Sequence, residues 1–461
     1  MASRILFGTN GIRGVVNKDL TPEFVTKVAI AIGTYFRARA RNQKILVGYD
    51  SRTSSILLSR SLISGIASTG CNVYDVGYAP TPAIQYAVKH FEMDGCIIIT
   101  ASHNPPEYNG IKVVDEDAVE ISRDEERKIE GIFHEEKFLR NKWSDLGKID
   151  AFPGIIEVYK EAIKRHIDIK AIREKQFRVV VDPANGVGSL VTPYLLSEIG
   201  CEVLTINSQL DGNFPGRLPE PKPETLGVLS STTKAVKADL GVAHDGDADR
   251  CIFTDELGNV CLGDITGTII VDYILQRSQS RLAVTPISTS TLLEEVVKTH
   301  NAKLRWTKVG STIVTKKMQE INAIIGMEDN GGIFYSPHQP VRDGAMTAVL
   351  MLEILAKKKT TLSQLINKLP KYHIIKERHD CPNQLKKRVH QEVLSQTEGL
   401  NRMTLDGVKV FFKDGSVLIR PSGTEAIYRI VAESKNDGRA KKIVEWGISL
   451  VKEGLKNASA R

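Results

Sequence analysis

The chain has 461 residues, too many for one hydrophobic core, and this length favours about three domains within a range of two to four. Its 41% hydrophobic and 25% charged residues are typical of a soluble globular protein. The 62 basic and 55 acidic residues give a net charge of +7. The basic residues are scattered, without interleaved aromatic side chains, which argues against nucleic-acid binding, whereas a mild positive charge suits small anionic substrates.

No segment is apolar for long enough to cross a membrane, and the N-terminus lacks the apolar core and cleavage site of a signal peptide. A cytoplasmic location is therefore expected. The six cysteines form no C-x-x-C pair, and several lie in apolar runs, so we expect reduced core residues. They are Cys71, Cys96, Cys201, Cys251, Cys261 and Cys381.

A glycine-rich loop, FGTNGIRG, stands at residues 7–14. Its spacing is not the dinucleotide fingerprint G-x-G-x-x-G, so it gives little support to nucleotide binding. It carries one guanidinium, that of Arg13, which suits a phosphate group better than a lysine does. A mere turn is the alternative interpretation. Thr21 and Pro22 then form an N-cap and first-turn pair that predicts a helix.

An apolar strand that ends in a polar loop recurs along the chain. The recurring segments are residues 45–52, 96–105, 177–188, 239–250, 281–290 and 323–332. Helical patterns lie between them, at residues 54–67, 155–167, 265–276 and 345–357. This alternation predicts several α/β domains with mostly parallel strand pairing, each presenting its loops at one edge of a sheet.

The second of these segments supplies a candidate nucleophile. Residues 96–99, CIII, predict a buried strand, and Pro105 stiffens the loop that follows. This loop presents Ser102 at the carboxyl edge of a sheet, where open α/β folds bind ligands. A hydrolase with His103 as its base is disfavoured, because neighbours on an extended segment point to opposite sides and no G-x-S-x-G elbow surrounds the serine. A serine that satisfies only loop backbone groups stays open as an alternative.

Three carboxylates alternate in the sequence DGDADR at residues 245–250. On an extended loop this spacing turns Asp245, Asp247 and Asp249 to one side, which is how a hard divalent cation is held. Mg²⁺ is the ion that such oxygen ligands favour. An EF-hand fails because its sixth position is Arg250 instead of glycine and a strand precedes the loop. A solvated acidic turn is the remaining alternative.

The chain changes character after Pro370. Apolar segments at residues 408–412 and 416–420 flank a short polar turn, so they predict a hairpin. A strand at residues 427–433 and a helix at residues 438–456 complete a smaller α+β unit.

Two loops carry groups that suit a sugar phosphate. RPSGTEAIYR, residues 420–429, offers guanidiniums, hydroxyls and backbone N–H groups, the ingredients of a phosphate nest, although a plain hairpin turn is the alternative. GMEDNGG, residues 326–332, offers Glu328 and Asn330, which suit sugar hydroxyls. Together with Ser102 and the carboxylates, these loops predict phosphoryl transfer, which relies on positioning and charge neutralisation. The candidate phosphate-binding residues are Arg420, Ser422, Gly423, Thr424 and Arg429.

At these residues the sequence resembles the α-D-phosphohexomutase family. FGTNGIRG, TASHNP, DGDADR, GMEDNGG and RPSGTEA occur in the family's order and at about its spacings over the whole chain. The resemblance implies three similar α/β domains with mixed, mostly parallel sheets plus a C-terminal α+β domain around a central cleft. The expected domains are a phosphoserine-bearing domain at residues 1–150, a metal-binding domain at 151–255, a sugar-recognition domain at 256–370 and a phosphate-binding domain at 371–461.

The resemblance also implies roles for single residues. Ser102 corresponds to the serine that is phosphorylated in the working enzyme. One Mg²⁺ ion per active site is expected on this phosphoserine and on Asp245, Asp247 and Asp249. The expected substrate-binding residues are Lys308 and Gly310 of the segment TKVG, with Glu328 and Asn330. The expected catalytic residues are Ser102, Arg13, His103, Lys112 and Arg250.

The implied reaction passes a phosphoryl group from phosphoserine 102 to a hexose phosphate docked at residues 420–429. The product is a bisphosphorylated hexose, which serves as intermediate and activator, turns over and returns its other phosphate to Ser102. FGT-x-GIRG, TASHNP and TKVG are closer to the phosphoglucosamine mutase branch than to phosphomannomutases. A hexosamine phosphate is therefore the expected substrate, and a hexose phosphate, as in phosphomannomutase or phosphoglucomutase, is the alternative.

The sequence departs from that branch at three places. Asn10 and Ser311 stand where aspartates are usual, and EDNGG replaces E-x-S-G-H, so a histidine discussed as acid or base in relatives is absent. His338 is a candidate substitute, and the general base stays unassigned. A non-catalytic sugar-phosphate sensor, against which the complete DGDADR argues, and a metal-dependent phosphatase are remote alternatives. No nucleic-acid or membrane partner is expected, and a homo-oligomer is compatible with the sequence.

Overall fold

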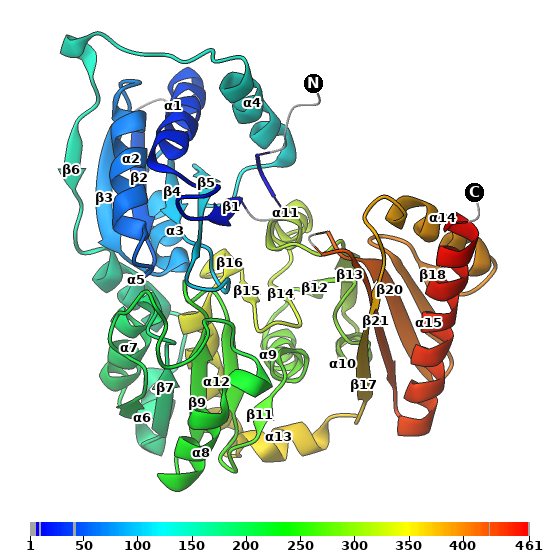
Figure 1. Ribbon diagram of the computed structural model, residues 1–461. Helices are drawn as coiled ribbons and strands as arrows, with labels where there is room; N and C mark the ends of the chain where they lie inside the picture. The colour runs from blue at the N-terminus through cyan, green and yellow to red at the C-terminus, as the bar shows by residue number, and fades with distance from the viewer. Residues whose placement is uncertain (1–5, 9–10, 40–42, 424, 460–461) are drawn as a thin grey trace. The chain divides into compact units, whose positions relative to one another are not determined.

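The computed structural model describes residues 6–8, 11–39, 43–423 and 425–459. The chain forms two compact units, shown in Figure 1. Unit 1 consists of residues 1–270 and 330–363, and unit 2 consists of residues 271–329 and 364–461. Two positions singled out in the sequence, Asn10 and Thr424, lie outside the described residues.

A mixed six-stranded sheet begins unit 1, with the strand order β1-β5-β4-β2-β3-β6. Strands β4, β2, β3 and β6 are parallel, whereas β1 and β5 run antiparallel to their neighbours. The strands are β1 (Ile12–Val15), β2 (Lys44–Tyr49), β3 (Asn72–Tyr78), β4 (Gly95–Ile99), β5 (Tyr108–Asp115) and β6 (Ile149–Ala151). The helices are α1 (Pro22–Arg39), α2 (Ser55–Ala67), α3 (Thr81–His90) and α4 (Arg123–His134).

The core of this sheet follows from its sequence pattern. The apolar strands β2 and β4 are buried along nearly their whole length, as expected of parallel strands with helices on both faces. Helices α1 and α2 lie side by side against the sheet in Figure 1, and α1 buries a stripe that includes Val28 and Ile32. Thr21 caps α1, accepting a hydrogen bond from the Phe24 N–H at 3.3 Å.

A second mixed sheet in unit 1 has the order β11-β10-β9-β7-β8. Strands β9, β7 and β8 are parallel, and β10 is antiparallel to β9 and to β11. The strands are β7 (Arg178–Asp182), β8 (Glu202–Thr205), β9 (Leu240–His244), β10 (Cys251–Thr254) and β11 (Val260–Cys261). The helices are α5 (Ile155–Lys164), α6 (Ile169–Lys175), α7 (Thr192–Glu198) and α8 (Gly227–Ala235). Unit 1 also contains the antiparallel pair β15 (Ile333–Tyr335) and β16 (Gln339–Arg342), and helix α12 (Gly344–Lys358).

Unit 2 combines a parallel strand group with an antiparallel sheet. The parallel group is β12 (Leu282–Pro286), β13 (Lys303–Thr307) and β14 (Ile325–Met327), with α10 (Leu292–Thr299) and α11 (Ser311–Ile321). The antiparallel sheet has the order β17-β21-β20-β19-β18. Its elements are β17 (His373–Asp380), α14 (Lys386–Gln396), β18 (Arg402–Met403), β19 (Val408–Phe412), β20 (Gly415–Pro421), β21 (Ile427–Ser434) and α15 (Asp437–Ser459). Helices α9 (Gly263–Arg277) and α13 (Leu362–Lys368) contain two of the three points where the chain changes unit, and the third lies between Asp329 and Asn330.

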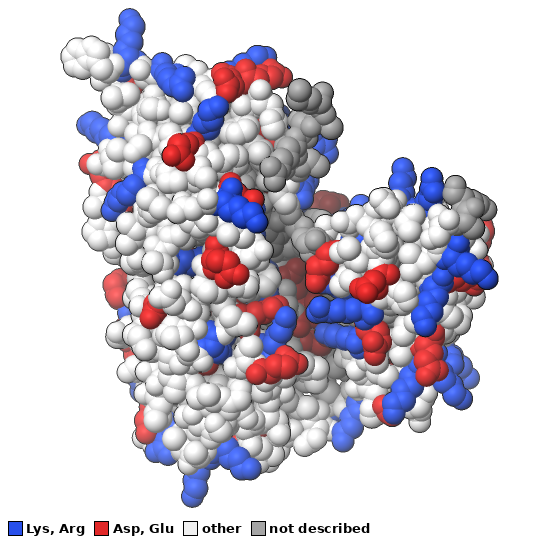
Figure 2. All heavy atoms as spheres, viewed as in Figure 1, with Lys and Arg blue, Asp and Glu red and all other residues white. Residues whose placement is uncertain are grey.

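These sheets and helices confirm the predicted α/β fold class with a C-terminal α+β part. The predicted hairpin is present, because Phe412 pairs with Gly415 across a two-residue turn. The six cysteines are buried and free, as expected. Among the described residues, no helix is both long and apolar enough to cross a membrane. On the face in Figure 2, basic and acidic side chains are interspersed, with no continuous basic field.

Candidate active site

Ser102 follows β4, on the loop that leads into β5. It is fully buried, and its φ of 52° lies in the left-handed region. Its N–H donates to Thr100 Oγ1 at 2.8 Å, and its Oγ donates to Asp245 Oδ2 at 2.8 Å. A left-handed conformation costs a non-glycine residue on the order of 1–3 kcal/mol, so contacts around Ser102 must hold it there. The loop therefore directs one buried hydroxyl at a carboxylate from another sheet.

The three aspartates lie on the loop between β9 and β10. The expectation of an extended loop was wrong, because the Ala248 N–H donates to the Asp245 carbonyl and closes a turn, with Ala248 at a φ of 57°. The turn curls the chain, and carboxylate oxygens of Asp245, Asp247 and Asp249 lie within 4.8 Å of one another. All three residues are buried. The structure thus brings Ser102 and this carboxylate triad together in unit 1.

Two of the predicted cations contact the carboxylate triad. Lys112, on β5, places its Nζ 2.9 Å from Asp247 Oδ2 and 3.6 Å from Asp249 Oδ2. Arg250 donates its backbone N–H to Asp245 Oδ1 at 3.1 Å, and its Nε lies 3.7 Å from Asp245 Oδ2. These contacts leave the triad only partly neutralised.

Two further contacts to the triad had no signal in the sequence. Thr81, the first residue of α3, donates its N–H to the Asp247 carbonyl at 3.0 Å and its hydroxyl to Asp247 Oδ2 at 2.8 Å. Arg342, the last residue of β16, donates to Asp249 Oδ2 at 2.5 Å. The Thr-Pro pair at residues 81–82 is recognisable only as a helix start, and Arg342 belongs to no motif.

Two carboxylates of the triad, those of Asp245 and Asp247, have opposite pKa shifts. Burial, and then the charges of Asp249 and Asp247, raise the pKa of Asp245 well above its usual value. Burial also acts to raise the pKa of Asp247, but the Lys112 ammonium, the Thr81 hydroxyl and the Arg342 charge together lower it. Burial acts to lower the pKa of Lys112, yet the carboxylates raise it overall. Asp247 and Lys112 therefore form a buried ion pair, while Asp245 lacks a full counter-charge.

Several buried polar atoms of the site make no hydrogen bond with the residues that the structure describes. On the carboxylate side these are Asp247 Oδ1 and Asp249 Oδ1. On the arginine side they are Nε and one terminal nitrogen of Arg13, and Nε of Arg250. Buried polar atoms are normally paired, so the carboxylate oxygens fit a hard cation such as Mg²⁺ and the guanidinium N–H groups fit an anion.

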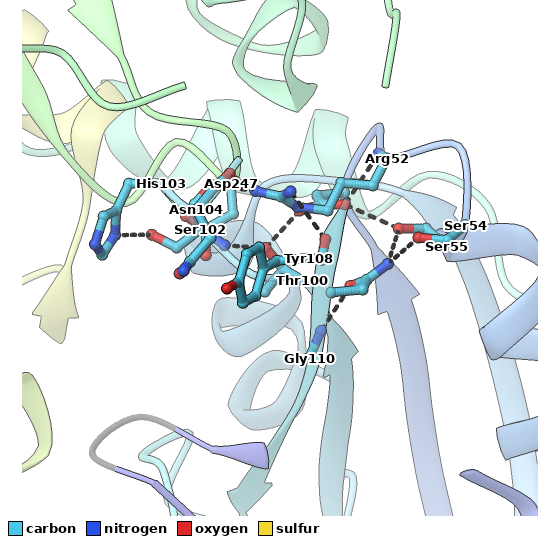
Figure 3. A network of polar contacts seen from close by, with 12 residues as sticks. Arg52, Ser54, Ser55, Thr100, Ser102, His103, Asn104, Tyr108, Gly110 and Asp247 are labelled. Carbon is cyan, nitrogen blue, oxygen red and sulfur yellow. Dashed lines mark hydrogen bonds and ion pairs between the residues drawn. The ribbon is translucent and has the colours of Figure 1, made fainter. Parts of the chain in front are cut away.

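Arg13 contacts the serine loop, and His103 belongs to it. Arg13, on β1, donates to Asn104 Oδ1 at 2.7 Å. His103 Nδ1 lies 3.3 Å from Ser102 Oγ, as Figure 3 shows. The premise that neighbouring side chains point apart was therefore wrong, because the left-handed turn at Ser102 replaces the extended segment. The Arg250 charge, then burial and then Arg13 lower the pKa of His103, so the imidazole is neutral at neutral pH.

The other predicted substrate-binding residues are divided between the units. Asn330 belongs to unit 1, where its Oδ1 accepts a hydrogen bond from the Gly332 N–H at 3.2 Å. Glu328 follows β14 in unit 2 and is buried. Lys308 is exposed, and Gly310 precedes α11 with a φ of 142°, a conformation that a side chain would strain.

The predicted phosphate loop joins β20 and β21 in unit 2. Arg420 and Arg429 are directly opposite each other on these strands. Like charges in this position repel unless anions lie nearby, and Arg420 pairs with Asp406 at 2.8 Å while Arg429 pairs with Glu425 at 2.5 Å. Buried Ser422 accepts a hydrogen bond from the Glu425 N–H, and a side chain at Gly423 would meet open space. The loop thus presents two guanidiniums that surface carboxylates hold.

His338, the candidate substitute for the missing histidine, has a buried side chain in unit 1. Its ring stacks on Tyr86 with centroids 5.1 Å apart, and its Nε2 lies 3.3 Å from Asp343 Oδ2. These contacts account for its burial as part of the packing between α3 and the β15–β16 pair.

Four family descriptions match the chain in order. They are phosphoglucomutase/phosphomannomutase α/β/α domain I at residues 4–140, domain II at 157–258, domain III at 262–372 and the C-terminal domain at 380–445. Three similar α/β/α domains and a different C-terminal domain are thus present.

Similar proteins cover nearly the whole chain. A phosphoglucomutase/phosphomannomutase of Thermococcus kodakarensis is 45% identical over 98% of this chain and 99% of its own. A phosphoglucosamine/phosphogalactosamine mutase of Sulfurisphaera tokodaii is also 45% identical, over 95% of this chain and 97% of its own. A crystal structure of a phosphoglucomutase/phosphomannomutase family protein from Burkholderia thailandensis has a TM-score of 0.87 at 27% identity, covering 100% of this chain and 98% of that one.

Proposed function

This chain belongs to the phosphoglucomutase/phosphomannomutase family of phosphohexomutases, which are intramolecular phosphotransferases, and we propose that it interconverts hexosamine 6-phosphate and hexosamine 1-phosphate through phosphorylated Ser102. The observation that supports this most directly is the hydrogen bond between Ser102 Oγ and Asp245, in a site with unpaired carboxylate oxygens and unpaired guanidinium N–H groups. These two sets of atoms suit a cation and a phosphoryl group at the same serine.

The proposed reaction has two balanced half-reactions. In the first, a sugar hydroxyl attacks the phosphorus of phosphoserine 102, the bond from phosphorus to Oγ breaks, and the hydroxyl proton leaves. This produces a bisphosphorylated hexosamine and free Ser102. In the second, Ser102 Oγ attacks the phosphorus of the other phosphate, the bond from this phosphorus to the sugar oxygen breaks, and that oxygen takes up a proton in place of the one that Oγ loses. This releases the isomeric monophosphate and forms phosphoserine 102 again. The bisphosphorylated sugar is therefore both intermediate and activator, and the base that accepts the proton is unassigned.

Residues of unit 1 are proposed to surround the transferring group. Arg13 and Arg250 would donate their unpaired N–H groups to phosphoryl oxygens, because guanidiniums bind such oxygens well. Lys112 would keep Asp247 ionised. His103, with its lowered pKa, would act as a neutral hydrogen-bonding group beside Oγ.

The three aspartates and the Ser102 oxygen are the proposed holders of one Mg²⁺ ion. Their oxygen-only donor set, burial and unpaired oxygens fit a hard divalent cation. When bound, the ion would offset the negative charge of the phosphoryl oxygens during transfer.

Residues of unit 2 are proposed to bind the part of the sugar phosphate that does not react. Arg420 and Arg429, opposite each other on β20 and β21, offer two guanidiniums to the second phosphate, together with Ser422, Gly423 and Thr424. Lys308, Gly310 and Glu328, with Asn330 of unit 1, remain the proposed contacts for the sugar.

The choice of sugar is the finer part of the proposal. The Sulfurisphaera relative is named for amino sugars, and a 35% identical protein of Methanococcus maripaludis is named phosphoglucosamine mutase. The Thermococcus relative is named for glucose and mannose phosphates, so the phosphoglucomutase/phosphomannomutase activity is the alternative. The predicted domain boundaries, the cytoplasmic location and the absence of nucleic-acid and membrane partners remain predictions.

The test begins with Ser102→Ala. We expect it to abolish conversion of glucosamine 6-phosphate to the 1-phosphate, because no hydroxyl is left to carry the phosphoryl group. Intact-mass measurement of the wild type incubated with bisphosphorylated sugar should show one added phosphate, which the variant lacks. Ser189→Ala is a matched control, since the hydroxyl of this buried serine donates to the nearby Gly186 carbonyl, and the variant should keep both properties.

Parallel assays with glucosamine, galactosamine, glucose and mannose phosphates then decide the sugar. Highest kcat/KM on a glucose or mannose phosphate would replace the amino-sugar assignment by the alternative. Undiminished turnover by Ser102→Ala would contradict the phosphoserine mechanism. Release of free phosphate without need for a bisphosphate would instead indicate a phosphatase, and binding without turnover by the wild type would indicate a sensor.

A further inference from the structure

Arg52, just after β2, is among the largest side chains that are fully buried. It belongs to the segment ILVGYDSR, to which the proposed reaction gives no role. A guanidinium has five N–H donors in a rigid fork, and here all five are used. Nε donates to Asp50 Oδ2 at 3.0 Å. The four terminal donors reach the backbone carbonyls of Ser102 (2.9 Å), Asn104 (2.6 Å), Pro105 (2.6 Å) and Tyr108 (3.0 Å).

Asp50 holds the N–H side of Ser102 through the hydroxyl of Thr100. Its Oδ2 accepts a hydrogen bond from Thr100 Oγ1 at 2.6 Å, and Thr100 Oγ1 in turn accepts one from the Ser102 N–H at 2.8 Å. Its Oδ1 is occupied by the Ser55 hydroxyl and the Arg52 N–H, at 2.9 and 3.1 Å. The Asp50–Arg52 pair therefore holds the carbonyl of the nucleophile directly, through Arg52, and its N–H indirectly, through Thr100. Figure 3 shows Arg52, Thr100 and Ser102 in this network.

Ser102 needs this grip because its backbone is left-handed. A serine released from these contacts relaxes to a negative φ, which rotates the Cα–Cβ bond and carries Oγ away from Asp245. The Ser102 carbonyl, which Arg52 binds, is also packed closely against Gly246 of the carboxylate loop. A Cβ atom on Gly246 would lie 2.6 Å from the Ser102 carbonyl oxygen. The Phe214 ring, 5.1 Å from the guanidinium carbon, covers Arg52.

We infer that the Asp50–Arg52 pair is the positioning device of the phosphoryl-carrying serine: it locks the left-handed turn that aims Ser102 Oγ at the carboxylate triad. Arg52 bonds none of the reacting atoms and acts only through the backbone. This inference rests on the proposed function. Because sugar-binding groups lie elsewhere, loss of the pair lowers the rate of phosphoryl transfer, kcat, and leaves KM for the sugar phosphate unchanged.

The first experiment uses Arg52→Lys, which keeps the positive charge beside Asp50 but offers three donors from a flexible stem in place of five in a fixed plane. Misplacement of a reacting group by about 1 Å can cost about 100-fold in rate. We expect kcat for glucosamine 6-phosphate to fall about 10- to 100-fold, with KM within about twofold of the wild type. Single-turnover transfer from the phosphorylated variant, quantified by intact mass, should slow by the same factor.

A second variant is needed in case Arg52→Lys folds poorly because Asp50 loses its guanidinium partner. Asp50→Asn with Arg52→Met removes both charges, so no unpaired charge remains buried. We expect a folded protein with at least the same loss of kcat. The matched control is Lys160→Met, which removes a buried cation from its pairs with Glu198 and Glu157 on the same unit. It should lower the thermal midpoint and keep kcat.

Each outcome decides the inference. The inference would be overturned if folded Arg52→Lys kept the wild-type kcat, or if its loss of kcat were no larger than that of Lys160→Met. It would also be overturned if KM rose as kcat fell. A double variant that regains full kcat would also overturn it. These results leave the proposed function standing as long as Ser102→Ala is inactive and unphosphorylated, whereas an active Ser102→Ala rejects the function itself.

Discussion

Asp245 is a buried carboxylate with two carboxylate neighbours, and at the scale of single residues this is the most unfavourable charge arrangement of the site. Burial and the charges of Asp249 and Asp247 raise its pKa. Lys112 compensates Asp247, and Arg342 contacts Asp249. Among the described residues, Asp245 receives a backbone N–H, the Ser102 hydroxyl and a guanidinium nitrogen 3.7 Å away. Mutual repulsion in the triad should therefore destabilise the protein without metal and be relieved by a cation.

We expect Asp245→Asn to raise the thermal unfolding midpoint in EDTA above that of the wild type, because it removes one repelling charge at constant shape. It should also abolish the rise in midpoint that Mg²⁺ gives the wild type, measured by differential scanning fluorimetry. Asp255→Asn is the control: this buried carboxylate accepts hydrogen bonds in its own turn, so its loss should lower both midpoints and keep the Mg²⁺ effect. A less stable Asp245→Asn in EDTA would contradict the repulsion.

At the scale of elements, the first turn of α4 holds two adjacent glutamates with opposite pKa shifts. Burial acts to raise the pKa of Glu125, but the backbone and hydroxyl of Ser122 lower it to about 2 through a capping box. Burial raises the pKa of Glu126 to about 7, and Arg123 opposes this only in part. Glu125 therefore stabilises the fold as an anion, whereas Glu126 stabilises it as a neutral acid.

The sign of the pH effect follows from these values. The Glu126 contribution is fully present below its unfolded pKa of 4.5 and is lost as pH rises through about 7. We expect the thermal midpoint of Glu126→Gln to fall less than that of the wild type between pH 4.5 and pH 7. At pH 7 its midpoint should equal or exceed that of the wild type. Glu125→Gln, its neighbour, should instead lower the midpoint at pH 7, since the capping box is lost. Calorimetry of the three proteins across this pH range measures both effects. If the thermal midpoints of Glu126→Gln and the wild type changed with pH in parallel, the prediction for Glu126 would be contradicted.

At the scale of the whole molecule, the proposed site residues fall into two compact units. Ser102, the carboxylate triad and their cations lie in unit 1, and the phosphate loop lies in unit 2. The unit boundary runs through the third family domain, residues 262–372. The proposed metal site and the proposed site for the non-reacting phosphate thus fall in different compact units of the chain.

Hydrogen exchange can test this division. We expect Mg²⁺ to slow amide exchange in peptides that cover residues 100–112 and 245–250, because binding to the native state suppresses local opening. Peptides that cover residues 416–434, with β20 and β21, should exchange at an unchanged rate. Asp245→Asn serves as the control and should lose the protection of the first two peptides. Protection confined to residues 416–434 would indicate that Mg²⁺ binds in unit 2 and would contradict the proposed metal site in unit 1.

The sequence by itself determined the elements and the chemistry of the loops, because both arise from residues a few positions apart. The apolar run at residues 96–99 forms β4, and the turn after Phe412 closes a hairpin, as predicted. The spacing of DGDADR alone indicates a cation site. Helix periodicity, capping and turn preferences are local properties, so a single chain displays them.

Only the tertiary structure decided how these loops are held. Thr81 reaches Asp247 and Arg342 reaches Asp249 from elements that are distant in the chain, and Arg52 binds a loop 50 residues away. The left-handed turn that brings His103 beside Ser102 depends on those contacts, and the sequence suggested an extended segment instead. Such contacts leave no periodic pattern, since they form only when segments that are distant in the sequence pack together and bury their polar groups against one another.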